Sequence, residues 1–214
     1  MDSKTILSIE TSSNVCGIAI TKGTELICLK EDFNFRKHIE VLPSLYENIM
    51  NESKLSLKKI DAIAVSIGPG SFTGLRIGLG FAKGIAYSHG LPIIPVPTFL
   101  SLAYSLRSSQ PSSGIILSHG TKVFYQEFGW LKEVPSPLLS SAVFNIKMLK
   151  DEKKIDFQSN CESILEVDTI IKKACLTAEN IGCLANINFN NWLQNRPYQL
   201  VPDYIANFNI NPIG

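Results

Sequence analysis

The segment between Gly68 and Gly78, which reads GPGSFTGLRIG, constrains the fold more than any other part of the chain. It follows the apolar run Ile60–Ile67, whose β-branched residues predict a buried strand. Gly-Pro-Gly ends that strand, Ser71 can cap a helix, and the helix is expected to reach about Ser88. Glycine inside a helix costs about 1 kcal/mol relative to alanine. The helix still contains Gly74, Gly78, Gly80 and Gly84, so we expect another backbone or a ligand to approach it closely.

The first half of the chain predicts alternating strands and helices around this segment. Apolar runs separated by turn residues indicate an opening meander, followed by a helix with one apolar stripe. Pro43 lies inside that stripe and predicts either a helix start near Leu42 or a kink. The predicted strands are Thr5–Glu10, Val15–Thr21, Glu25–Asp32 and Leu91–Val96, and the further helices are Lys37–Ser53 and Pro97–Arg107.

The second half is less regular. Residues 114–117 and 122–128 predict a strand pair, residues 154–157 a strand, and residues 168–177 a short helix capped by Asp168. The tail from Asn186 onward is rich in asparagine and shows little periodicity. Both halves begin with a strand hairpin, as expected of a duplicated α/β lobe.

Composition limits the possible partners. The 214 residues are 45% hydrophobic and carry a formal net charge of +1, so the chain can bury a core but gives no sign of a basic face. A protein that grips tRNA alone needs such a face, so a tRNA partner is expected to be held through another protein. The five cysteines lack metal-site spacing and predict buried, reduced thiols. No signal peptide is evident, and prolines interrupt the uncharged stretch Gly84–Leu106, so we expect a cytoplasmic protein without a membrane span.

The opening ILSIETSS, with the hairpin VCGIAI after it, resembles the start of the actin/hexokinase/Hsp70-like fold, in which a carboxylate ends the first strand and a hydroxyl-rich turn faces phosphates. Together with GPGSFTGLRIG and PIIPVPTFLSLA, it resembles the TsaB (YeaZ-like) family over roughly residues 1–105. The resemblance implies an α/β fold of two lobes with mixed sheets flanked by helices. The first lobe is expected at residues 1–105 and a second, shortened lobe at residues 106–214.

This resemblance also implies a role. TsaB is a degenerate relative of TsaD, the subunit that transfers a threonylcarbamoyl group to adenosine beside the anticodon of tRNA. We therefore expect a non-catalytic scaffold or activator that binds TsaD, is joined by TsaE in a ternary complex, depends on TsaC-type chemistry for its substrate, and forms a homodimer when alone. The expected interface residues lie on the first-lobe helices: Leu42, Leu45, Tyr46, Ile49, Gly74, Leu75, Gly78 and Phe81.

Two other functions remain open from the sequence. A stand-alone actin-like ATPase or kinase would use Glu10, Thr11 and Ser12 as weak nucleotide-binding candidates, although Glu10 can equally be a carboxylate that accepts bonds from turn amides. The run Ser118–Tyr125 also lacks the acidic and arginine residues that relatives carry there. A glycoprotease-like metallopeptidase would need a metal site, but His38 is followed by Leu42 where TsaD has its second histidine, and His38 alone reads as a helix-start surface residue. We expect no catalytic residue, no metal and no cofactor.

Overall fold

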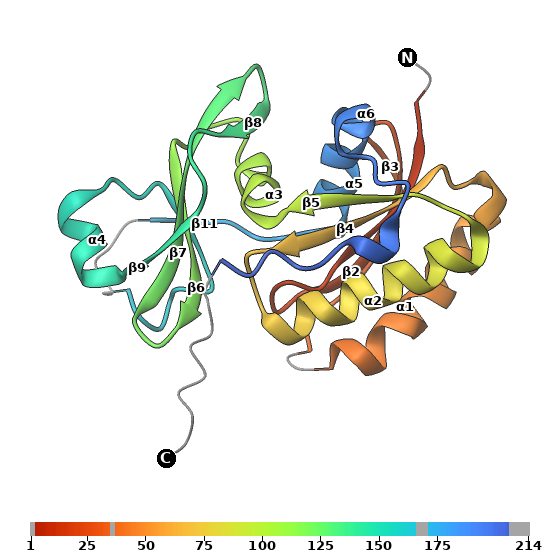
Figure 1. Cartoon of the computed structure of the whole chain (residues 1–214), viewed down its shortest axis with the longest axis horizontal. Helices are drawn as coiled ribbons and strands as arrows, with labels where there is room; N and C mark the ends of the chain where they lie inside the picture. The colour runs from red at the N-terminus through yellow and green to blue at the C-terminus, as the bar shows by residue number, and fades with distance from the viewer. Residues whose placement is uncertain (1–2, 35–36, 166–170, 206–214) are drawn as a thin grey trace.

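The computed structural model describes residues 3–34, 37–165 and 171–205, and its helix and strand labels are those of Figure 1. Two mixed sheets stand side by side, each forming the centre of one lobe (Figure 1). The helix α3 (Thr98–Ser105) and the stretch after β11 (Lys172–Lys173) connect the lobes.

The first sheet has the strand order β3-β2-β1-β4-β5. The first three strands form the expected antiparallel meander, and β1, β4 and β5 are parallel. Helices α1 and α2 cover one face of this sheet, and α5 covers the other (Figure 1). The bounds are β1 Thr5–Glu10, β2 Cys16–Lys22, β3 Glu25–Asp32, β4 Ala62–Gly68, β5 Ile93–Pro97, α1 His38–Ser53, η1 Leu57–Lys59, α2 Phe72–His89 and α3 Thr98–Ser105.

The second sheet repeats this plan in reduced form. Its order is β11-β10-β6-β7-β8, with β9 also paired to β7. Antiparallel strands again lie on one side of a central strand, β6, and short parallel strands on the other. The duplicated pattern gives the actin/hexokinase/Hsp70-like class with a smaller second lobe. The bounds are β6 Ser113–His119, β7 Lys122–Leu131, β8 Val134–Pro137, β9 Ala142–Asn145, α4 Ile146–Glu152, β10 Phe157–Ser159 and β11 Lys172–Lys173.

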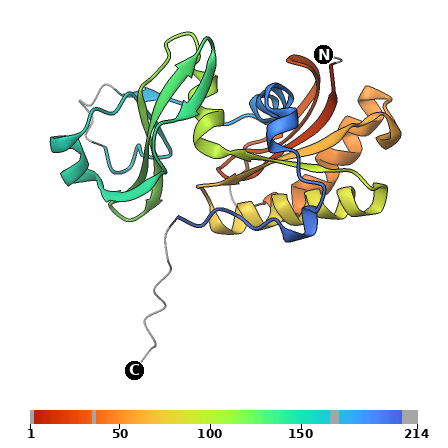
Figure 2. The same cartoon turned by 45° about the horizontal axis from the view of Figure 1, so that its top comes forward.

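The chain returns to the first sheet after β11. Helices α5 (Ala178–Ile187) and α6 (Phe189–Trp192), with the turn η2 (Pro197–Gln199), lie against first-lobe elements (Figures 1 and 2). The first sheet is therefore covered by residues on both sides of the expected boundary at residue 105.

Two helix predictions need correction. Residues 172–177 contain strand β11 and extended chain, and the helix begins only after Thr177, whose hydroxyl accepts a bond from Asn180 N at 3.1 Å. Asp168, the expected cap, lies outside the described residues. The predicted helix Lys37–Ser53 is confirmed as α1, but the alternative of a helix start near Leu42 is wrong, because α1 begins at His38 and contains Pro43 on its exposed side.

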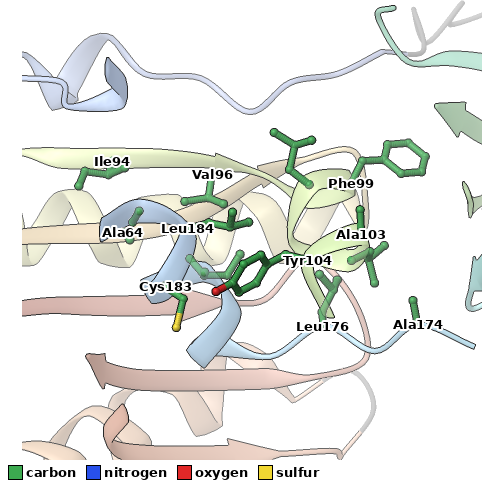
Figure 3. Close-up of a cluster of buried hydrophobic side chains, with 14 of the residues drawn as sticks. Ala64, Ile94, Val96, Phe99, Ala103, Tyr104, Ala174, Leu176, Cys183 and Leu184 are labelled. Carbon is green, nitrogen blue, oxygen red and sulfur yellow. The ribbon is translucent and has the colours of Figure 1, made fainter. Parts of the chain in front are cut away.

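A hydrophobic core joins the two lobes between α3, α5 and the sheets. Figure 3 shows Leu184 of α5 facing Val96 of β5, with Phe99 of α3 at the end of the same cluster. Phe128 and Phe157 of the second sheet belong to this cluster as well. A separate cluster lies beneath α1 and α2, centred on Leu7, Ile9, Leu42, Ile49, Ile63 and Leu79.

The five cysteines are free thiols. Cys16, Cys28, Cys161 and Cys183 are buried as expected, whereas Cys175 is exposed and corrects that expectation. The uncharged stretch Gly84–Leu106 is divided among α2, β5 and α3. Within the described part of the chain, no helix combines the length and the apolar character needed to cross a membrane.

Candidate functional site

The first turns of α2 are fastened to the β1–β2 turn. Ser71 N donates to the Ser12 carbonyl at 2.7 Å, and Thr11 Oγ1 donates to the Gly74 carbonyl at 2.9 Å. The Ser71 hydroxyl caps the helix by accepting a bond from Gly74 N at 3.2 Å, as the sequence predicts. A Cβ atom at Gly74 would overlap the Thr11 carbonyl, and one at Gly78 would overlap the Thr11 hydroxyl. The expected close approach is therefore made by the chain's own turn at these two glycines.

The other two glycines of α2 serve a different surface. Gly80 and Gly84 are exposed, and an added Cβ at either position would have no neighbouring atom within 4 Å. Tyr87, which follows Gly84 by about one turn, is 89% exposed. These three residues, Gly80, Gly84 and Tyr87, form what we call the outer face of α2.

The expected interface residues divide between the interior and the surface. Five of them are buried: Leu42, Ile49, Gly74, Leu75 and Gly78. Leu45, Tyr46 and Phe81 are partly exposed where the two helices meet, and the rings of Tyr46 and Phe81 pack edge to face at 5.7 Å. The apolar pattern thus identified mainly the side of each helix that covers the sheet, and it did not include the exposed residues Gly80, Gly84 and Tyr87.

Glu10 is fully buried at the end of β1. Its Oε1 atom accepts bonds from Ser12 N and Ser12 Oγ, each at 2.6 Å, so the interpretation as a carboxylate bonded to its turn is confirmed. Its Oε2 atom has no hydrogen-bond partner among the described residues. Burial raises the pKa of Glu10 from 4.5 to about 7, because removal from water disfavours the charged form. Thr11 and Ser12, the other nucleotide-binding candidates, are also buried.

Replacement of Glu10 by glutamine is expected to remove a pH dependence of stability. Because the pKa of this acid is raised on folding, the folded state holds the proton more tightly, and its contribution to stability is lost as the pH rises from about 4.5 to about 7. The shift corresponds to roughly 3 kcal/mol. The glutamine keeps the acceptor for Ser12 but does not ionise. Urea unfolding from about pH 5 to about pH 8 should show that the free energy of unfolding of Glu10→Gln increases relative to that of the wild type as the pH rises. A pH-independent difference between the two proteins would refute this assignment.

His38 is not the surface residue that the sequence suggests. Its side chain is buried, and its Nε2 atom lies 2.8 Å from the Ser13 carbonyl, which can only accept a bond, so Nε2 carries the proton. Leu42, one turn later, is buried in the core. Among residues 3–34, 37–165 and 171–205, no three or more His, Cys, Asp or Glu side chains gather in a metal-binding group.

A cleft of about 1380 Å³ lies between the two lobes. Its first-lobe wall includes the turn Ser12–Asn14 and the start of α2, and its second-lobe wall includes Ile116, Phe124 and Lys122. Hydroxyl groups are plentiful, but Asp203 is the one carboxylate among the described lining residues. A kinase-type site holds its magnesium nucleotide with carboxylates and a catalytic base, so this lining is poorly equipped for that chemistry.

The sequence of this chain is similar to that of known proteins. The family model of TsaD, tRNA N6-adenosine threonylcarbamoyltransferase, matches residues 33–135. The tRNA threonylcarbamoyladenosine biosynthesis protein TsaB of Haemophilus influenzae is 35% identical over 103 residues, which cover 48% of this chain and 43% of that protein. The chain thus matches less than half the length of that relative.

Two further similarities extend over more of the chain. TsaB of Buchnera aphidicola subsp. Schizaphis graminum is 30% identical over 158 residues, which cover 70% of this chain and 75% of that protein. A crystal structure of an uncharacterized protein with similarity to peptidase YEAZ, from Pseudomonas aeruginosa, superposes with a TM-score of 0.81 over 95% of this chain and 100% of that one, at 21% identity. The latter likeness shows the fold, and the sequence relatives show the family. The chain belongs to the TsaB family.

Proposed function

We propose that this chain takes part in the formation of threonylcarbamoyladenosine in tRNA as a non-catalytic subunit that binds TsaD. The names of its relatives as threonylcarbamoyladenosine biosynthesis proteins support the pathway. The shared family model supports a common ancestry with TsaD itself. In this role the chain acts in the cytoplasm as a scaffold and activator, TsaE joins it in a ternary complex, and tRNA is reached only through the complex.

The outer face of α2 is the observation that carries this proposal. Gly80 and Gly84 let another helix approach the α2 backbone closely, because neither residue has a side chain that would hold the two backbones apart. Tyr87 supplies an exposed aromatic side chain, the type most often found to dominate binding energy. Tyr46 and Phe81 extend the surface toward α1. The buried members of the expected set support this face from below and do not contact the partner.

The same face explains why a homodimer is expected when the chain is alone. An exposed helix surface that lacks its partner can pair with an identical surface about a two-fold axis. Both assemblies would use Gly80, Gly84 and Tyr87, so binding of TsaD is expected to displace the second copy.

Replacement of Gly84 by arginine is expected to abolish the complex with TsaD. A long charged side chain on the outer face would hold the partner helix away, and we expect affinity to fall at least about a hundredfold. Light scattering of the chain mixed with TsaD of the same organism measures this as loss of the one-to-one complex. The folded chain itself should be unaffected, because position 84 is open.

Two control variants sharpen this test. Gly84→Ala adds only a methyl group at the same position and should keep the complex. Met148→Arg places the same new charge on α4 of the second lobe, at a side chain that is 64% exposed, and should also bind TsaD. If wild-type protein ignores TsaD, the proposed function is wrong; if Gly84→Arg binds as well as Met148→Arg does, the proposed face is wrong.

A further inference from the structure

Residues 197–205, which we call the strap, run back along α2 toward the second lobe (Figures 1 and 2). Just before the strap, Gln194 pairs with Ile93, the first residue of β5, through reciprocal backbone bonds of 2.8 and 3.2 Å. The strap then passes alongside α2 and ends between the two sheets (Figure 1).

Lys83 of α2 clamps the start of the strap. Its Nζ atom donates to the Leu200 carbonyl at 2.6 Å and to the Tyr198 carbonyl at 3.2 Å. These carbonyls lie at the end of the short turn η2, where backbone acceptors have no donor within the turn. A lysine ammonium is a strong donor for such groups, because hydrogen bonds from a charged group exceed neutral ones in strength.

Gly68 lets the middle of the strap lie directly on β4. Asp203 N donates to the Ile67 carbonyl at 2.8 Å, and a Cβ atom at Gly68 would lie 2.7 Å from the Asp203 carbonyl. Gly68 also has a φ of +121°, a conformation that other residues rarely adopt. Any side chain at position 68 would therefore push the strap away from the sheet.

Aromatic stacking holds the last part of the strap at the mouth of the cleft. The rings of Tyr204 and Phe72 lie 4.9 Å apart, and the Arg76 guanidinium lies 3.7 Å from the Phe72 ring. Arg76 Nε donates to the Tyr204 hydroxyl at 2.9 Å. These groups surround the first turns of α2, where that helix forms one wall of the cleft.

The strap is bound to the first lobe and reaches the cleft that both lobes line. The backbone crosses between lobes after α3 and again between β11 and α5, which leaves room for a hinge. Asp203, Tyr204 and Ile205 line the cleft opposite Ile116 and Phe124, and Ile205 packs against the core cluster to which those second-sheet residues belong.

We propose that the strap is a releasable clasp that holds the two lobes closed over the cleft. Besides its hydrogen bonds, the strap packs only the partly buried Leu200 and Ile205 against the cores, and its side chains Tyr198 and Val201 are 67% and 71% exposed. A segment that buries so little apolar surface can detach at far lower free energy than global unfolding requires. Detachment leaves the lobes joined by the backbone crossings and by the core between α3 and α5, and the cleft then opens about this joint.

Lys83→Met tests the clasp in the full-length chain, because methionine keeps the aliphatic stem but removes the donor. Backbone hydrogen exchange at residues 200–204 should accelerate roughly tenfold or more, as expected for the loss of charge-assisted bonds. Spin labels at positions 44 and 148, on the two lobes and in a Cys175→Ser background, should give a longer and broader distance distribution by pulsed electron paramagnetic resonance. Lys58→Met, which alters an exposed lysine of η1, should change neither the hydrogen exchange nor the distance between the labels.

Tyr204→Phe removes only the bond to Arg76 and should shift both readings in the same direction to a smaller extent. Exchange that accelerates while the distance between labels stays the same would overturn the proposal, since the strap would then be a tail without effect on the lobes. Unchanged exchange in both Lys83→Met and Tyr204→Phe would overturn it as well.

Discussion

Alanine at position 74 is expected to lower the free energy of unfolding by about 3 kcal/mol, whereas alanine at position 84 of the same helix is expected to raise it by about 1 kcal/mol. The first methyl group would overlap the Thr11 carbonyl, which belongs to the backbone and cannot turn aside. To accommodate it, α2 would have to move away from the β1–β2 turn and lose the bond from Thr11 Oγ1 to the Gly74 carbonyl. The second methyl group meets open space and gains helix propensity.

Urea or thermal unfolding of the two variants beside the wild type measures this difference. Both substitutions make the same chemical change in one helix, so their contributions from helix propensity cancel in the comparison. The difference between the two free energies of unfolding therefore measures the overlap with Thr11. Equal stabilities for the two variants would show that α2 does not lie against the turn as described. An arginine at position 78 would likewise overlap the Thr11 hydroxyl and disturb the fold. Gly78→Arg is therefore a poor probe of docking.

Phe99→Ala is expected to cost about 3–5 kcal/mol, since it opens a cavity in the core that joins the lobes. Phe99, labelled in Figure 3, is completely buried at the start of α3. It packs against the Phe128 ring of the second sheet, with ring centres 6.0 Å apart. The surrounding residues come from several elements, so they cannot collapse together into the space. Deletion of this side chain should weaken both lobes in one transition.

Phe33→Ala is the matched control for this core substitution. Phe33 is 70% exposed, so its removal should change stability by no more than about 0.5 kcal/mol. Calorimetry on both variants separates the two cases. A small effect at position 99, or a second-lobe transition that separates from an unchanged first-lobe transition, would contradict the shared core.

The first lobe could be predicted because its signals are local. Each strand of the meander is a short apolar run ended by turn residues, and Ser71 followed by Gly74 is a helix start that needs no distant contact. The second lobe was harder because its strands are short and β8 contains Pro135 and Pro137, which argue against a strand in sequence. The helix expected at residues 168–177 was placed too early, because α5 begins only at Ala178, and Thr177 gives a cap directly before it.

The proposed docking surface differs from the residues named from the sequence for a geometric reason. Apolar periodicity marks the side of a helix that is buried, so the residues named from it were mostly core residues such as Leu42 and Leu75. Successive residues of an α-helix turn by about 100°, so Gly78 and Gly80 face nearly opposite sides. The spacing alone therefore places the pair Gly74 and Gly78 on one side of α2 and the pair Gly80 and Gly84 on the other. The strap could not be predicted, because it depends on Lys83 and Gly68 meeting residues far along the chain.

The most direct test of the proposed function is hydroxyl-radical footprinting of the chain with and without TsaD. Tyr87 on α2 and Met148 on α4 are both well exposed and reactive, so each serves as the reference for the other. We predict that TsaD protects Tyr87 from oxidation and leaves Met148 unchanged. Oxidation of Tyr87 at the same rate in the presence of saturating TsaD would contradict docking through the outer face of α2.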